Sequence, residues 1–330
     1  HSPFRHLDRF THEDAEVFFG RGHQIRELYD RITNPTVAPI VLFYGQSGVG
    51  KSSLLDAGLL PRLQSSHEVC YLRREQERGL SGTLGQVIDP GDKSKAGDAG
   101  WQAREAELER PLVVIMDQVE EAFTRPNANQ QDEMERFLHT LKTTFGDVGR
   151  RPTGKLVLGF RKEWLAELED RLVEHQLPFT KVFLEPLDRR GIIEVVQGPT
   201  RDTRLREHYR LSVEEGLGEI VADGLLADRG SAIAPILQVL LTKMWTNAKT
   251  SNDQNPRFGQ ELFQQLKRDG ILLSDFLDQQ IAAFRQRFPE VVDSGLLLDF
   301  VALHTSPLGT ADQRTVDEVQ EQYEHLRATL

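Results

Sequence analysis

GQSGVGKS, at residues 45–52 of the chain, matches the pattern G-x-x-x-x-G-K-[ST]. Its members are Gly45, Gln46, Ser47, Gly48, Val49, Gly50, Lys51 and Ser52. The apolar run IVLFY, Ile40–Tyr44, precedes it and predicts a buried strand, and the following KSSLLDAGLL is typical of a helix. Glycines let backbone N–H groups wrap around a phosphate, and a helix N-terminus favours an anion. The stretch therefore predicts a phosphate-binding loop (P-loop).

This P-loop predicts binding of a nucleoside triphosphate together with Mg²⁺. In such loops the lysine reaches the β- and γ-phosphates, and the hydroxyl after it ligates Mg²⁺. We therefore expect ATP or ADP as the ligand, with Lys51 on the phosphates, Ser52 on Mg²⁺ and Ser53 as a further nucleotide contact. The alternative is a glycine-rich turn without a ligand. The pattern leaves the choice between ATP and GTP open.

A second apolar run, Leu112–Met116 (LVVIM), ends in the carboxylate of Asp117. A P-loop protein needs such a carboxylate at the end of a nearby strand, so we expect Asp117 to hold Mg²⁺ directly or through water. Glu120 and Glu121 follow closely, and one of them is expected to polarise the attacking water. The sequence leaves open which of the two does so, and a solvated acidic turn is the alternative.

A third apolar run, Leu156–Phe160 (LVLGF), ends in Arg161. An arginine at the carboxyl end of a strand beside the phosphates can sense or stabilise γ-phosphate charge. The alternative is a surface ion pair between Arg161 and Glu163 or another acid.

The first half of the chain alternates short apolar runs with helical patterns, which predicts an α/β fold with a parallel sheet covered by helices. The expected strands are Ile40–Tyr44, Val69–Leu72, Leu112–Met116, Leu156–Phe160 and Lys181–Leu184. The segment Gly79–Gly100 is rich in Gly, Asp, Ser and Lys and is expected to be a mobile insertion. After Pro186 the strand signal vanishes and helical patterns follow.

Composition excludes several classes of protein. With 40 basic and 51 acidic residues, the net charge is −11, which disfavours general nucleic-acid binding. No run reaches the roughly 18–20 apolar residues of a membrane span, and the N-terminus carries no signal-peptide core. The lone Cys70, in the expected strand VCYL, is read as a buried thiol in a reducing compartment, so we expect a cytoplasmic protein.

Five stretches in order resemble the novel-STAND group of NTPases, relatives of the NACHT and NB-ARC switch ATPases of bacterial signalling and antiviral defence. They are SPFRHLDRFTHEDAEVFFGR (2–21), GQSGVGKSSLLDAGLLPRL (45–63), VVIMDQVEEAFT (113–124), LGFRKEWLAEL (158–168), and the pair VVQGPTR (195–201) and SAIAPILQVLLTKMW (231–245). The resemblance spans most of the chain.

The resemblance implies further nucleotide contacts. Phe19, Gly20 and Arg21 belong to a motif whose backbone cradles adenine, and Pro235 belongs to a motif that packs on the base. The alternatives are a helix-entry turn at Gly20 and a helix N-terminal proline at Pro235. The chain departs from the family pattern at two positions: Gln24 replaces the usual acid and Ala234 replaces the usual Leu.

The resemblance also implies four parts. These are lead-in helices with the adenine-side motif (1–34), the P-loop NTPase core with its parallel sheet (35–186), an α-helical subdomain (187–275) and a partial winged-helix subdomain (276–330). The expected wing is Leu308–Val316, with Arg314 or His304 as a reader of the β-phosphate. Pro186–Arg190 is expected to be a hinge, because its backbone looks least constrained.

The function implied is that of an ATP/ADP switch with slow, regulatory hydrolysis. Exchange of ADP for ATP is expected to open the molecule for self-association and effector activation, with effector and sensor domains outside this chain. One alternative is continuous turnover, as in an AAA-type remodeller or a P-loop kinase. Another is a scaffold module that uses ADP as a structural element.

Overall fold

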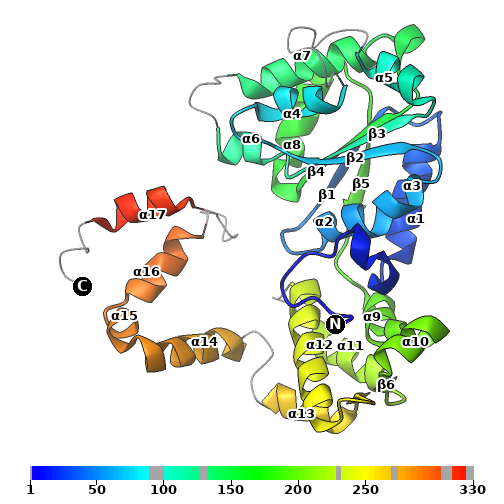
Figure 1. Cartoon of the computed structure of the whole chain (residues 1–330). Helices are drawn as coiled ribbons and strands as arrows, with labels where there is room; N and C mark the ends of the chain where they lie inside the picture. Colours follow the sequence, from blue (N-terminus) through cyan, green and yellow to red (C-terminus); the bar gives the residue numbers. More distant parts are fainter. Residues whose placement is uncertain are drawn as a thin grey trace. The chain divides into compact units, whose positions relative to one another are not determined.

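A computed structural model describes residues 2–88, 100–126, 132–227, 232–268, 274–305 and 314–324. Internal contacts divide the chain into two compact units, His1–Leu266 and Lys267–Leu330 (Figure 1). The larger unit contains the P-loop and the two strands that end in Asp117 and Arg161. The four-part division expected from the sequence stays a prediction.

The larger unit is built on a parallel sheet of five strands in the order β2-β3-β4-β1-β5. The strands are β1 (Ile40–Gly45), β2 (Glu68–Arg73), β3 (Leu112–Asp117), β4 (Lys155–Arg161) and β5 (Phe179–Leu184). All five predicted strands, and the predicted α/β class, are confirmed. Gly45 pairs in register with Arg161 on one side and Leu184 on the other, so the P-loop leaves the sheet beside Arg161.

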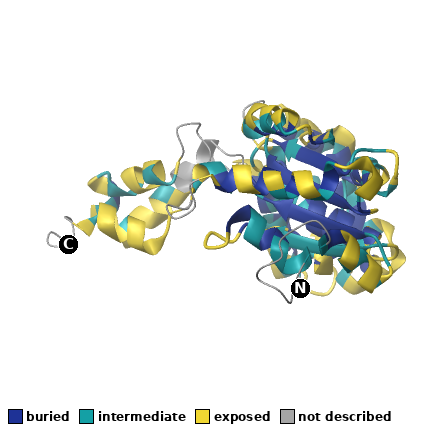
Figure 2. Cartoon of the chain, turned by 90° about the horizontal axis from the view of Figure 1, so that it is seen from above, coloured by how far each residue is buried: buried dark blue, intermediate teal, exposed yellow. Residues whose placement is uncertain are grey.

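Alternate side chains of the central strands enter two separate apolar clusters, which explains why these runs are apolar throughout. On β1, Ile40 and Leu42 face helices α4 (Gly79–Ile88), α5 (Gly100–Leu108), α7 (Glu133–Phe145) and α8 (Leu165–Glu174). Val41 and Phe43 face α1 (Gly22–Thr33) and the helix that follows the P-loop. Figure 2 shows the sheet as the buried centre of this unit.

The edge strand β2 corrects one expectation. Cys70 lies on β2 and is half-buried rather than fully buried, because β2 has a neighbour on one side alone. Burial nevertheless raises the pKa of the Cys70 thiol.

The helix after the P-loop runs through three segments: α2 (Lys51–Ser53), the π-helical η2 (Leu54–Leu59) and α3 (Leu60–Leu63). A Cβ at Gly58 would lie 2.9 Å from Ile25 of α1 and 3.1 Å from the Phe18 ring. Because Gly58 has no side chain, α1 and the residues before it pack directly on the π-helical segment η2. This contact fixes the lead-in segment, with its 3₁₀ helix η1 (His12–Val17), against the phosphate end of the sheet.

The predicted insertion Gly79–Gly100 is wrong for its first ten residues. These form the regular helix α4, whose Leu80 and Leu84 are buried in the core. Residues 89–99 lie outside the described part of the chain.

The rest of the larger unit is a helical region, as the sequence predicts. It contains α9 (Arg189–Arg201), α10 (Thr203–Tyr209), α11 (Leu217–Leu226), α12 (Ile233–Ser251) and α13 (Gln260–Arg268). Two features were not predicted: helix α10, and a small parallel pair formed by β6 (Ser212–Val213) and β7 (Arg257–Phe258). Figure 1 shows the N-terminal segment running between this region and the sheet.

In the smaller unit the structure describes the helices α14 (Ser274–Arg287), α15 (Pro289–Asp293), α16 (Leu296–Leu303) and α17 (Val316–Gln322). The expected wing, Leu308–Val316, falls largely on residues 306–313, outside the described part. His304 binds the Phe300 carbonyl through Nδ1, and Arg314 donates to the Leu303 carbonyl. Among the helices the structure describes, none has the length and apolar character needed to span a bilayer.

Candidate functional site

A cavity of about 280 Å³ opens where the P-loop, the carboxyl ends of β3 and β4, the N-terminal segment and the helical region meet. The sheet topology causes this meeting, because parallel strands present their carboxyl ends, and the loops after them, at one edge. The predicted site residues that line the cavity are Phe19, Arg21, Ser47, Gly48, Val49, Gly50, Lys51, Ser52, Ser53, Asp117, Glu120, Arg161 and Pro235. Gly20, Gly45, Gln46 and Glu121 do not line it.

The P-loop turns through two glycines with positive φ, Gly48 at 73° and Gly50 at 97°, a conformation that other residues adopt at a cost. Gly50 is the N-cap of α2, so the first free N–H groups of that helix face the cavity. Lys51 Nζ donates to the carbonyls of Gly45 (2.9 Å) and Gln46 (3.0 Å). Burial lowers the pKa of Lys51, and the nearby Glu120 carboxylate partly offsets this. An incoming phosphate would supply a stronger partner for this half-buried cation.

Asp117 is 1% exposed at the end of β3, and both of its carboxylate oxygens are held. Oδ1 accepts from the Gln118 N–H (3.0 Å) and Oδ2 accepts from the Tyr71 hydroxyl (2.6 Å). A Cβ at Gly159 of β4 would lie 2.9 Å from Oδ1, so a glycine there leaves room for the carboxylate. Each oxygen keeps a lone pair, and oxygen ligands of this kind suit Mg²⁺.

The turn after β3 decides which glutamate reaches the cavity. Gln118 adopts a positive φ of 62°, and the next N–H, that of Val119, donates to the Gly159 carbonyl (3.0 Å). This pins the turn to β4 and brings Glu120 into the cavity lining, whereas Glu121 begins helix α6 (Glu121–Thr124) outside it.

Glu120 is 5% exposed, and burial raises the pKa of its carboxyl to about 7. Its Oε1 lies 3.2 Å from Arg161 Nε, while its buried Oε2 accepts no hydrogen bond from the described residues. Arg161 thus pairs with an acid, as the alternative interpretation held; that acid is Glu120, and Arg161 also lines the cavity. A carboxylate with a free lone pair and a pKa near neutrality is suited to take a proton from water.

Arg21 holds the P-loop to the edge of the sheet. Its Nη2 donates to the Val49 carbonyl and its Nη1 to the Glu185 carbonyl, both at 2.7 Å. Burial lowers its pKa to about 10, so the guanidinium keeps its charge at neutral pH. Arg21 therefore shapes the loop from behind in addition to lining the cavity.

Gly20 and Phe19 join the lead-in segment to α9. Gly20 has a φ of 82°, and a Cβ there would lie 2.5 Å from the Gly191 carbonyl oxygen. The Phe19 ring occupies the space beside Gly198, where a Cβ would come within 2.2 Å of it. From the helical region, Pro235 Cγ faces Gly48 of the P-loop, 3.4 Å from where a Cβ at Gly48 would lie.

Several residues of the site were not predicted from the sequence. The cavity is also lined by Phe4, His6, Leu7, Asp8, Arg9, Phe10, Leu187 and Gln238, and Tyr71 binds Asp117 from behind the lining. Tyr71 reaches this edge because β2 pairs in parallel with β3, a strand order that the sequence pattern does not specify. The N-terminal contacts likewise join residues far apart in sequence and carried no signal in the pattern.

The parallel sheet, the P-loop and the strand-end Asp117 together define a P-loop NTPase. The profile of the family described as Novel STAND NTPase 1 (nSTAND1) matches residues 3–326. The chain belongs to this family, and the predicted resemblance is confirmed. No curated protein matches the chain.

Three solved structures from Aeropyrum pernix share the fold, each at 15% sequence identity. The ORC1 protein in complex with DNA has a TM-score of 0.53 over 96% of this chain and 79% of its own. The ORC2 protein matches in its ADP form with a TM-score of 0.50, and in its ADPNP–ADP complexes with 0.52, each over 94% of this chain and 85% of its own. At this identity the likeness concerns the fold alone.

Proposed function

We propose that the chain binds ATP or ADP with Mg²⁺ in this cavity and works as a slow ATPase switch. One observation carries the proposal: Lys51, Asp117, Glu120 and Arg161 converge on a single cavity that Pro235 of the helical region also lines. Lys51 and the α2 N-terminus bind the phosphates, and Ser52 and Asp117 hold Mg²⁺. The ORC2 structures, one in an ADP form and one with ADPNP–ADP complexes, fit this ligand class.

In this proposal Glu120 is the general base and Arg161 is the γ-phosphate sensor. Without nucleotide, the Arg161 guanidinium and the Glu120 carboxylate form an ion pair with each other. Arrival of the γ-phosphate gives Arg161 an alternative anionic partner and leaves Glu120 to take a proton from the attacking water. Glu121, outside the cavity, has no part in the chemistry.

The switch follows from a ligand that distinguishes two states, because a ligand with equal affinity for both shifts nothing. The γ-phosphate and its Mg²⁺ are the distinguishing groups. Pro235 belongs to the helical region and lines the same cavity, so it links the bound γ-phosphate and Mg²⁺ to that region. We propose that movement of the helical region governs self-association and effector activation. The protein would thus alternate between an ADP-bound and an ATP-bound form.

Replacement of Lys51 by Ala tests nucleotide binding. Loss of charge-assisted hydrogen bonds worth roughly 1.5–3 kcal/mol each should weaken ATP affinity by about tenfold or more. Calorimetry measures the ATP affinity of the variant. Lys142→Ala is the control, because Lys142 is exposed on α7, away from the cavity. An ATP affinity of Lys51→Ala within twofold of wild type contradicts the proposal.

Steady-state hydrolysis separates the switch from the turnover alternatives. A regulatory ATPase should turn over well below about 1 s⁻¹, the lower end of ordinary enzyme rates. Brisk, continuous turnover by the purified chain would favour a remodelling or kinase activity.

A further inference from the structure

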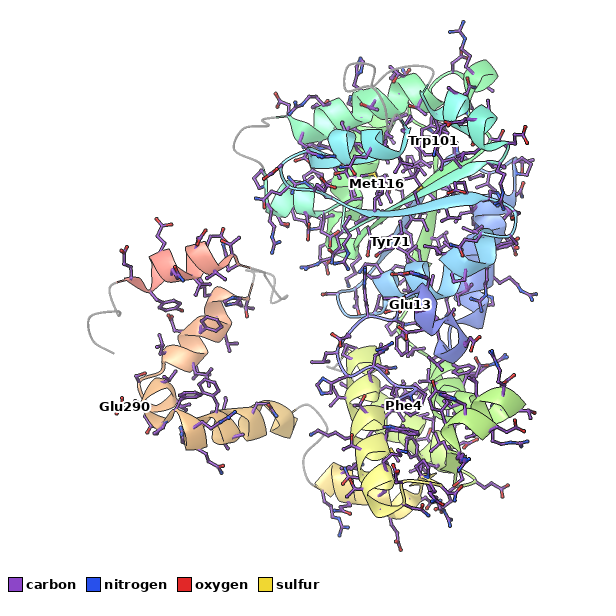
Figure 3. All side chains as sticks on the ribbon, viewed as in Figure 1. Phe4, Glu13, Tyr71, Trp101, Met116 and Glu290 are labelled. Atoms are coloured by element: carbon purple, nitrogen blue, oxygen red, sulfur yellow. The ribbon has the colours of Figure 1, made fainter. Side chains whose placement is uncertain are left out.

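The N-terminal segment Phe4–Phe10 is anchored at one end in the helical region. The Phe4 ring is 5% exposed and stacks on Phe258 of β7, with ring centroids 5.7 Å apart. Its edge meets Trp245 of α12 at 6.4 Å. Figure 3 shows Phe4 within the helical region and Tyr71 at the sheet, above it in this view.

The other end of the segment is anchored at the phosphate end of the sheet. The Phe10 N–H donates to Ser53 Oγ (3.2 Å), and the Phe10 ring packs against Phe18 at 5.5 Å. Between the two anchors, the segment lines the cavity. It therefore connects the helical region to the P-loop helix across the site.

Arg9 extends this connection to Tyr71. Its guanidinium lies 5.4 Å from the centre of the Tyr71 ring, and Nη1 donates to the Tyr71 hydroxyl oxygen at 3.2 Å. Arg9 Nη2 also lies 3.8 Å from the buried Asp56 carboxylate. The guanidinium thus sits between an aromatic face and a carboxylate, two partners that favour its charge.

Tyr71 in turn donates its proton to Asp117 Oδ2 over 2.6 Å, the usual length of a charge-assisted bond from a hydroxyl to a carboxylate. A phenolic hydroxyl is protonated throughout the neutral range, so Tyr71 is the donor in this bond. Donors of this kind fix the orientation of a metal-binding carboxylate, and their loss typically costs about 10–100-fold in metal affinity.

We propose that Tyr71 is a positioning residue for the Mg²⁺-binding carboxylate of Asp117, and that Arg9 holds Tyr71 in place. The N-terminal segment then ties the helical region to the metal site through Phe4, Arg9, Tyr71 and Asp117. The inference rests on the proposed function, since it takes Asp117 to bind Mg²⁺.

Tyr71→Phe tests the inference with Mg²⁺ and a fluorescent ADP as the probes. The variant should bind Mg²⁺ about 10–100-fold more weakly in the nucleotide complex. Its affinity for the nucleotide in EDTA should stay within twofold of wild type, because Lys51 and the P-loop are untouched. Tyr29→Phe is the matched control: Tyr29 packs on the same apolar cluster as Tyr71, and loss of its hydroxyl should leave the Mg²⁺ affinity unchanged.

Arg9→Ala gives a second route that leaves the core of the sheet intact, because Arg9 lies at the surface. It should weaken Mg²⁺ binding less than Tyr71→Phe does, and it should add nothing further in the Tyr71→Phe background. Such non-additivity is the signature of residues acting through one another. Additive losses would mean that Arg9 acts by another path, and would overturn its role.

Two failures can be told apart. If Tyr71→Phe binds Mg²⁺ with nucleotide as well as wild type does, the positioning role is wrong while the nucleotide site stands. If wild-type protein binds no nucleotide in either EDTA or Mg²⁺, the proposed function is wrong, and this inference is wrong with it.

Discussion

Glu120 and Glu121 are neighbours in the chain but have different surroundings. Glu120 is buried in the cavity beside Arg161, whereas Glu121 is half-exposed at the start of α6. Glu120→Gln should therefore slow ATP hydrolysis by about 10²–10⁴-fold, the usual contribution of a general base, and leave Mg·ATP binding intact. Glu121→Gln is the matched control and should hydrolyse ATP within about threefold of wild type. Single-turnover assays measure both, and the reverse ranking would assign the base to Glu121.

The raised pKa of Glu120 gives this prediction a pH signature. A base must be ionised, so the wild-type kcat/KM for ATP hydrolysis should rise with pH and level off above about 7, the pKa of the Glu120 carboxyl in the ligand-free protein. The stability effect has the opposite sign. A carboxyl whose pKa is higher in the folded than in the unfolded state favours folding below its unfolded pKa, and this contribution is lost as pH rises to about 7. In the Glu120→Gln variant, both the rise of hydrolysis with pH and this pH-dependent contribution to stability should be absent.

At the scale of elements, Gly20 sets how closely the lead-in segment approaches α9. Gly20→Ala combines a positive φ with a backbone contact at 2.5 Å, so it should lower the free energy of unfolding by about 1–3 kcal/mol. Gly22→Ala, two residues on, meets nothing within 4 Å and should change stability by less than about 1 kcal/mol. Urea denaturation measures both; equal values would show that Gly20 makes no close contact.

The elements that the sequence predicted well are those specified by local pattern. The apolar run before Gly45 and the spacing up to Lys51 lie within one segment, so a strand, a loop and a helix follow from neighbouring residues. The contact of Tyr71 with Asp117 spans 46 residues and depends on strand order, which no local pattern specifies. Which of Glu120 and Glu121 lines the cavity likewise depends on the left-handed conformation of Gln118, which a glutamine at this position does not predict.

At the scale of the whole larger unit, two hydrogen bonds lie at the hinge expected at Pro186–Arg190, whose role stays a prediction. Arg21 donates to the Glu185 carbonyl just before this segment, and Asp188 within it caps α9 by accepting from the Gly191 N–H at 2.7 Å. A movement of the helical region stays a prediction, but it must break or carry along these contacts. Moving an equilibrium from 1:99 to 99:1 takes about 5.5 kcal/mol, more than one base contact supplies, so the γ-phosphate and Mg²⁺ must share it.

Energy transfer between labels at Ser65→Cys and Thr250→Cys, in a Cys70→Ala background, measures that movement. The first position lies beyond the P-loop helix and the second lies on α12, and both are exposed. Transfer should differ between ADP and a non-hydrolysable ATP analogue. A control pair at Ser65→Cys and Lys142→Cys, both on the sheet part, should not respond. Identical transfer in both nucleotides for the first pair would rule out the swing.

The burial of Phe4 has a practical consequence for anyone dividing this protein into pieces. A recombinant fragment cut just before β1, where the recognisable ATPase motif begins, would lose the ring that covers Phe258 and Trp245. It would also lack one wall of the cavity. Newly bared aromatic faces invite aggregation, so poor solubility of such a fragment would reflect the position of the cut rather than any weakness of the sheet.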